Sequence, residues 1–215
     1  MEVLKGVKLG SNGGNIDLRA GKDFVKKYNE ALEDIKNGGE GLGEAEIKLG
    51  KEDLDAYRAE IGVPERDTVA VGKTDVPGLE DNTFKGASPA VRKEAGLPDL
   101  DTLMPDREIK APSENPLFTR HAEEGVANEF DTAVSKLGID PKDVTGTLYI
   151  HQSNPSGVCK KCIQGLANDT VKPGILKQLS LKYPDLTIKV TSEVDESVKV
   201  TGRSTFTIKN GKYVD

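Results

Sequence analysis

The feature that most constrains the fold is a pair of short motifs holding three of the chain's four histidine and cysteine residues. His121-Ala122-Glu123 is followed, after 35 intervening residues, by Cys159-Lys160-Lys161-Cys162. One imidazole and two thiolates are ligands that zinc prefers, and three protein ligands leave the fourth tetrahedral position for water. If these residues act together, the fold must bring position 121 beside positions 159 and 162.

The hydrophobic pattern around the motifs predicts alternating helices and strands. Val126, Phe130 and Val134 recur at helical spacing, whereas the apolar run at 146–152 is typical of a buried strand. We expect helices over 22–37, 51–61, 115–137, from 159 to before Pro173, and 175–182, with strands near 68–71, 83–84, 146–152, 186–191 and 204–209. The proline-rich segment 86–115 is expected to be a long connection that borders a site.

This order predicts an α/β fold with a single central mixed sheet of about five strands and helices packed on it. Residues 67–215 would form this domain. Residues 1–66 would form a small helical N-terminal extension, or a linker from a larger protein.

Composition excludes several classes of protein. In 215 residues no apolar run approaches the roughly 20 residues of a membrane span, and the N-terminus lacks the apolar stretch of a secretory signal peptide. Two cysteines are too few for a disulfide framework. The net charge is −6, yet residues 141–215 hold 11 basic and 7 acidic side chains. A polyanion could bind there, although charge alone favours a solvated surface.

Glu123 is placed for proton transfer. It lies two residues from His121, where its carboxylate can contact a water molecule without binding the metal. Bound zinc lowers the pKa of its water toward about 7, which makes a nucleophile at neutral pH. Cys159 and Cys162 would lie at a helix start that favours thiolates. A redox pair, a disulfide, or a structural zinc site with His151 as fourth ligand are the alternatives.

The motifs resemble the zinc-deaminase signature, H-x-E followed by P-C-x-x-C. The stretch 154–162, NPSGVCKKC, is more specific, because it resembles the N-P-x-G-x-C-x-x-C stretch of the DddA-like cytosine deaminases. These are toxin domains at the C-termini of bacterial secreted polymorphic toxins. Residues 148–151 and 78–80 are also similar, so the resemblance covers about residues 67–192. Val158, in place of proline, matches the toxin group better than the tRNA or free-nucleoside deaminases.

The resemblance implies that His121, Cys159 and Cys162 bind zinc and that Glu123 shuttles protons while cytosine in DNA becomes uracil. Single-stranded DNA is the favoured substrate and duplex DNA a possible one, because the target base must be unstacked. It also implies a toxin that a specialised system secretes as part of a larger protein, that acts in the target-cell cytoplasm, and that a cognate immunity protein binds. The alternatives are an RNA or nucleotide deaminase and a non-catalytic, zinc-stabilised binding module.

Four further residues are candidates for substrate contacts, and each also has a simpler structural interpretation. Asn154 could bond the base or only shape a turn, and Lys160 and Lys161 could hold a DNA phosphate or only solvate the surface. His151 could line the mouth of the pocket or be an ordinary strand residue. Glu124 is expected to be solvated, because its side chain points about 100° away from that of the preceding residue.

Overall fold

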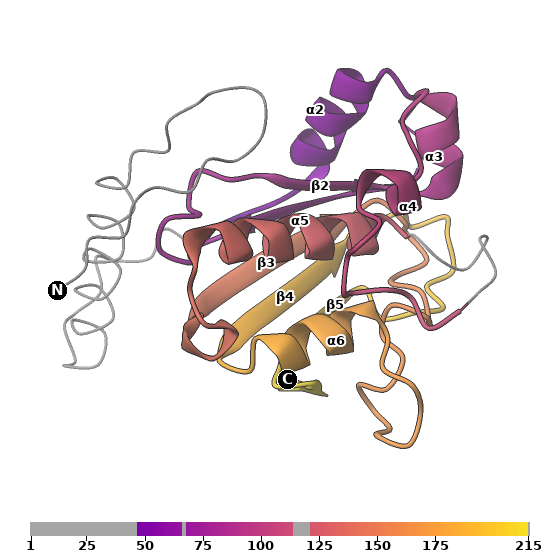
Figure 1. Ribbon diagram of the computed structural model, residues 1–215. Coiled ribbons are helices and arrows are strands. Elements are labelled where there is room, and N and C mark those ends of the chain that lie inside the picture. The colour runs from indigo at the N-terminus through magenta and orange to yellow at the C-terminus, as the bar shows by residue number, and fades with distance from the viewer. Residues whose placement is uncertain (1–46, 66–67, 114–120, 215) are drawn as a thin grey trace, which may run out of the picture. The chain divides into compact units, whose positions relative to one another are not determined.

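Six strands form one mixed sheet, with helices on both of its faces (Figure 1). The computed structural model describes residues 47–65, 68–113 and 121–214. The expected α/β class is therefore confirmed. The helix predicted over 22–37 lies outside the described residues. Among the described helices, none is long and apolar enough to cross a membrane.

The strand order places the ends of two parallel strands at one edge of the sheet. The order is β2-β1-β3-β4-β5-β6, and β3 and β4 are parallel, whereas the other neighbouring pairs are antiparallel. The strands are β1 (Val69–Thr74), β2 (Phe84–Ala87), β3 (Gly146–Gln152), β4 (Leu186–Ser192), β5 (Thr205–Lys209) and β6 (Lys212–Tyr213). The loops that follow β3 and β4 therefore leave the sheet side by side.

The sixth strand, β6, exceeds the predicted number because it is only two residues long. It pairs with β5 through a tight turn in which Asn210 and Gly211 both have positive φ angles, 46° and 74°. An Asn-Gly turn of this kind matches the twist of a hairpin. Two residues are too few for the alternating pattern that reveals a strand in a sequence.

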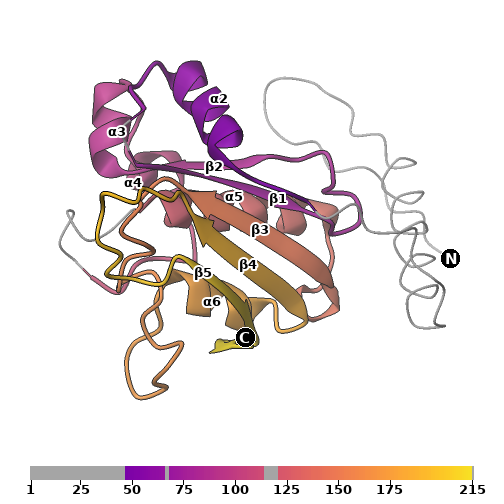
Figure 2. The same ribbon diagram turned by 180° about the vertical axis from the view of Figure 1, so that it is seen from behind.

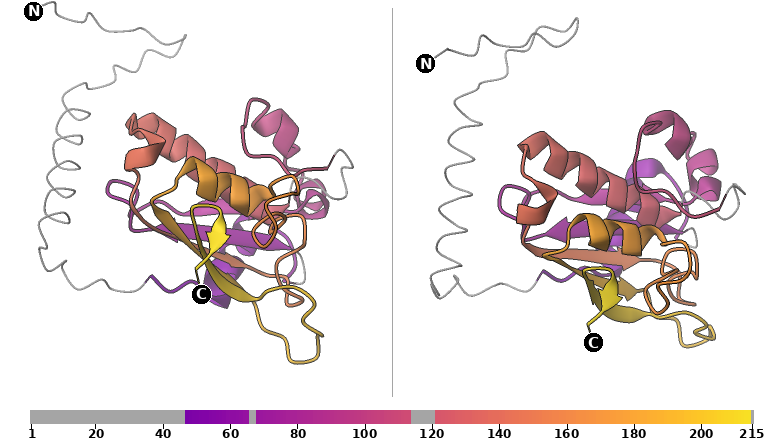
Figure 3. Two further views of the ribbon diagram at one scale, coloured as in Figure 1. Left: turned by 90° about the horizontal axis from the view of Figure 1, so that it is seen from below. Right: turned by 60° about the horizontal axis from the view of Figure 1, so that its bottom comes forward.

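The helices cover the two faces unequally. They are α2 (Lys51–Ile61), α3 (Pro89–Glu94), α4 (Leu100–Leu103), α5 (Ala122–Leu137) and α6 (Ile175–Lys182). Figures 1 and 2 show α5 and α6 on one face, and α2 on the other near β1; the views in Figure 3 agree. The bounds of α2 and α6 are those predicted.

Two short helices, α3 and α4, interrupt the segment 86–115, which was predicted to be one long connection. The Ser88 side chain caps α3 by accepting from the amide of Val91, and Asp99 caps α4 in the same way. Proline at the first turn of α3 is compatible with a helix, because its missing amide would have no partner there. The prolines of this segment predicted a connection because proline usually ends a helix, and the sequence therefore gave no indication of α3 and α4.

The helix α2 packs on the sheet through Leu54 and Tyr57, which lie in one apolar cluster with Val69 and Val71 of β1. The described part of the chain belongs to a compact unit that begins at residue 45. The helix that the sequence assigned to the N-terminal extension is thus part of the same unit as the sheet.

The helix α5 approaches β2 at a contact between glycines. A Cβ atom added to Gly86 would lie 1.8 Å from the Ala122 carbonyl oxygen, and one on Gly125 would lie 2.8 Å from the Gly86 Cα. Further along α5, Phe130 makes edge-to-face contacts with Phe84 and with Tyr183 of the α6 C-cap, at ring centroid distances of 5.4 and 5.5 Å. These contacts fix the position of the amino-terminal end of α5.

We predict that Gly86→Ala destabilises the fold by about 3 kcal/mol, because the added methyl group meets backbone that cannot move without shifting α5. Urea unfolding followed by circular dichroism would measure the change. Gly50→Ala is the matched control, since a Cβ there meets nothing within 4 Å. It should cost no more than about 1 kcal/mol through the weaker helix cap. Equal losses for the two variants would contradict the close contact.

Candidate metal centre

His121 stands at the amino-terminal end of α5 as its N-cap residue, with extended backbone angles (φ −62°, ψ 165°). The sequence placed it inside a helix that begins near residue 115, and this was wrong for position 121. The first amides that donate back along the helix are those of Glu124 and Gly125, both to the His121 carbonyl oxygen. Residues 114–120 lie outside the described residues.

Cys159 and Cys162 lie in a single turn. The amides of Cys162 and Ile163 donate to the Cys159 carbonyl oxygen at 3.1 and 3.3 Å, and the chain continues in turns and bends. The helix predicted from Cys159 to before Pro173 was therefore wrong. Gly165 adopts a φ of +87°, and the Asn168 side chain closes a local turn by accepting from Thr170, so helical hydrogen bonding cannot propagate.

The structure brings the three predicted metal ligands together. Nδ1 of His121 lies 2.9 Å from Sγ of Cys159 and 3.2 Å from Sγ of Cys162, and the two sulfurs are 3.4 Å apart. In a tetrahedral zinc site these separations would be about 3.6 Å for nitrogen to sulfur and about 3.8 Å between sulfurs. The three distances would need to grow by about 0.4 to 0.7 Å to reach these values. Both cysteines are free, so the described group could hold a metal ion, and its ligand types suit zinc.

Glu123 lies beside this group and is 5 % exposed. Burial and the negative charge of Cys159 raise the pKa of its carboxyl group, and a hydrogen bond with the Cys162 thiol acts in the opposite direction. The side chain therefore contacts the sulfur of Cys162, and its carboxyl group has a pKa above that of an exposed glutamate. A buried carboxyl group with a raised pKa beside such a group is suited to act as a proton carrier.

The two thiols differ in charge. The hydrogen bond with Cys162 and the contact with His121 lower the pKa of Cys159 to about 4, although burial opposes this shift. Burial and the hydrogen bond with Cys159 raise the pKa of Cys162 well above its usual value. The pair by itself thus carries one negative charge. A bound cation would allow both sulfurs to ionise.

The turn before Cys159 is held by the loop that follows β4. The amides of Thr201 and Gly202 donate to the Ser156 carbonyl oxygen, and Val158 forms a bridge with Arg203. At Gly157, which has a φ of +94°, a side chain would collide with Gly202. The parallel pairing of β3 and β4 brings these two loops together.

Asn154 shapes a turn, which was one of the two predictions for this residue. Its side-chain oxygen accepts from the amide of Ser156 at 3.1 Å and from the Ser156 hydroxyl at 2.7 Å. Lys160 is exposed next to the centre, and Lys161 donates to the side chain of Gln164 at 3.3 Å. The proximity of both lysines to the cysteines is compatible with a phosphate contact.

His151 is buried on the sheet face opposite α5. It pairs in register with Val71, which packs against α2, and its Nδ1 lies 2.7 Å from the Thr191 hydroxyl oxygen. Because side chains alternate across a strand, His151 points away from the face that carries Leu148 and Ile150. Within the described part of the chain it is not a member of the metal-ligating group.

Glu124 was expected to be solvated, but it is fully buried. Its carboxylate accepts from Nε of Arg107 at 2.8 Å and from the Ala111 amide at 3.3 Å. One turn on, Asn128 donates to the carbonyl oxygen of Ile109 at 2.8 Å. These contacts attach the segment 107–111 to the first two turns of α5. The spacing of charges in the sequence carries no signal for a pair that forms only when a distant loop folds over the helix.

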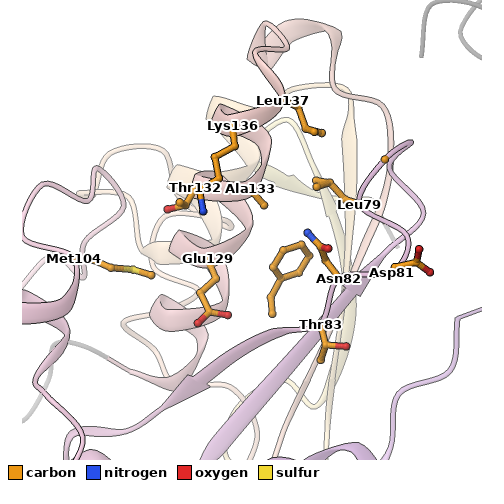
Figure 4. Close-up of a pocket in the computed structure, with 12 residues that line it drawn as sticks. Leu79, Asp81, Asn82, Thr83, Met104, Glu129, Thr132, Ala133, Lys136 and Leu137 are labelled. Carbon is orange, nitrogen blue, oxygen red and sulfur yellow. The ribbon is translucent and has the colours of Figure 1, made fainter. Parts of the chain in front are cut away.

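A separate groove of about 660 Å³ lies between α5 and the connection of β1 to β2 (Figure 4). Its walls include Leu79, Asn82, Phe84 and Glu129. None of the three candidate metal ligands lines it. This groove is therefore distinct from the candidate metal centre.

Comparisons with protein-family models, curated proteins and solved structures found no match to this chain.

We predict that His121→Ala weakens zinc binding by at least about 100-fold, more than the 10–100-fold typical of a ligand's supporting partners. His151→Ala is the matched control. It removes the chain's other histidine from the opposite face of the sheet, so it should leave zinc binding unchanged. Competition with a chromophoric chelator would measure both affinities. Weaker binding in the His151 variant would contradict the ligand set.

We predict that Arg107→Met destabilises the protein by about 3 kcal/mol, because it removes the cation that balances a buried carboxylate. Asp101→Asn removes the exposed partner of the same arginine and should cost less than about 1 kcal/mol. Urea unfolding of the two variants would measure the difference. A small loss for Arg107→Met would show that Glu124 does not depend on this arginine.

Proposed function

We propose that the protein is a zinc-dependent hydrolase that deaminates cytosine to uracil in DNA, with single-stranded DNA as the favoured substrate. The observation that carries this proposal is the position of Glu123. Its buried carboxyl group lies two residues from the ligand His121 and in hydrogen-bond contact with the ligand Cys162. A purely structural zinc site has no need for a buried acid at this place.

The chemistry needs one metal ion and one proton carrier. When bound, zinc would supply the Lewis acid that activates water. Glu123 would take a proton from that water and deliver it to N3 of the ring. A bond then forms between C4 and the water oxygen, and Glu123 passes a second proton to the departing amino group. The C4–N4 bond breaks, so that cytosine and water become uracil and ammonia.

The wider biological role rests on the resemblance of the motifs. We propose that the enzyme is delivered as part of a larger secreted toxin, acts on DNA in the cytoplasm of a rival cell, and is blocked by a cognate immunity protein. The exposed Lys160 and half-exposed Lys161, beside the centre, support a polyanionic substrate. An unstacked base in single-stranded DNA would avoid the few kcal/mol needed to flip a base out of a duplex.

We predict that Glu123→Gln lowers the rate of uracil formation by at least about 100-fold while zinc content stays at the wild-type level, because only the proton carrier is lost. Cytosine-containing single-stranded and duplex DNA would be assayed separately by uracil-glycosylase cleavage. Glu129→Gln is the matched control, since this half-buried glutamate of α5 lines the separate groove.

Zinc-loaded protein that forms no uracil in either DNA would overturn the DNA-deaminase proposal. RNA or free nucleotides would then be assayed as substrates, and failure with these would leave the zinc-stabilised binding module. Full activity of the Glu123→Gln variant would overturn the role of this residue.

A further inference from the structure

The loop that carries the two cysteine ligands is attached to α6 by tertiary contacts. The amide of Leu176, in the first turn of α6, donates to the carbonyl oxygen of Cys162 at 3.0 Å. The amide of Gly174 donates to the carbonyl oxygen of Gln164 at 2.7 Å. Because the chain after Cys162 is not helical, these contacts perform the role that helical hydrogen bonds would otherwise have.

The buried side-chain anchor of this loop is Lys177. Its side chain is 8 % exposed, and its Nζ donates to the carbonyl oxygen of Gly165 at 2.7 Å and forms an ion pair with Asp169. Gly165 fits closely against the stem of this lysine, since an added Cβ would lie 3.0 Å from Cδ of Lys177. One lysine therefore joins the middle of the loop, a local turn beyond it and the first turns of α6.

We propose that Lys177 is a positioning residue of the metal centre, which holds the 159–174 loop so that Cys162 faces Cys159 and His121. Gly165 is three residues from Cys162, and the Leu176 contact joins the same helix directly to Cys162. This inference rests on the proposed binding of zinc by the three ligands. A lysine buried against a backbone carbonyl is a costly arrangement for a loop that has only to connect two elements.

The test compares two lysines of the same helix. Lys182 also lies on α6, but it pairs with Asp131 and Glu108, away from the loop. Zinc affinity of Lys177→Met, Lys177→Arg and Lys182→Met would be measured by chelator competition, and cobalt(II) would report thiolate ligation through its charge-transfer absorption. Unfolding of the metal-free proteins would show how much stability each variant loses.

We predict that Lys177→Met weakens zinc binding by about tenfold, as loss of a ligand's supporting contacts does elsewhere. Lys182→Met should stay within about twofold of the wild type even if it is equally destabilised, since it leaves the loop contacts in place. Lys177→Arg should recover most of the affinity because it can still donate to Gly165. If Lys177→Met does not fold, hydrogen exchange of the wild-type protein tests whether α6 is coupled to metal binding. Zinc should then slow exchange of the Leu176 amide.

Equal zinc affinity of the wild type and Lys177→Met would overturn the role of Lys177 alone. Unchanged exchange at the Leu176 amide would overturn the coupling of α6 and its lysine to the ligand loop. A wild-type protein that binds no zinc would overturn both this inference and the metal centre. The two failures are therefore distinguishable.

Discussion

The close approach of α5 to β2 is the contact on which the candidate metal centre depends. Gly86 and Gly125 allow the helix backbone to come so near the sheet that a single Cβ atom would touch the Ala122 carbonyl oxygen. The amide of Lys85 in the same strand donates to the side chain of Glu129 at 2.6 Å, which attaches the helix at a second place. Since His121 is the N-cap residue of this helix, its place relative to β3 and β4 follows from that packing.

The cysteine ligands reach the same place by a different physical route. The parallel pairing of β3 and β4 sends two loops out from one edge of the sheet, and these loops bind each other through Ser156, Val158 and Arg203. Contacts with α6 then hold the chain beyond Cys162. The three ligands therefore come from a rigid helix end and from a loop whose shape is set almost entirely by its neighbours.

The adjacent glutamates of α5 show how burial gives like residues different properties. Glu124 is paired with Arg107 in a fully buried contact that attaches a distant segment to the helix. The pKa of Glu123, which faces the thiols, is instead raised by burial and by the charge of Cys159. The carboxylate of Glu124 thus forms a structural ion pair, whereas the carboxyl group of Glu123 remains able to exchange protons.

The sequence by itself determined the fold class, the bounds of α2, β3 and α6, and which three residues form the group that could hold a metal ion. Periodicity reports which face of an element is buried, and only a few residue types bind zinc. The tertiary structure alone decided that the C-x-x-C segment is a turn, that His151 lies on the opposite face from the centre, and that Glu124 is buried. These features arise from contacts between residues distant in the sequence, and the local spacing of residue types does not report such contacts.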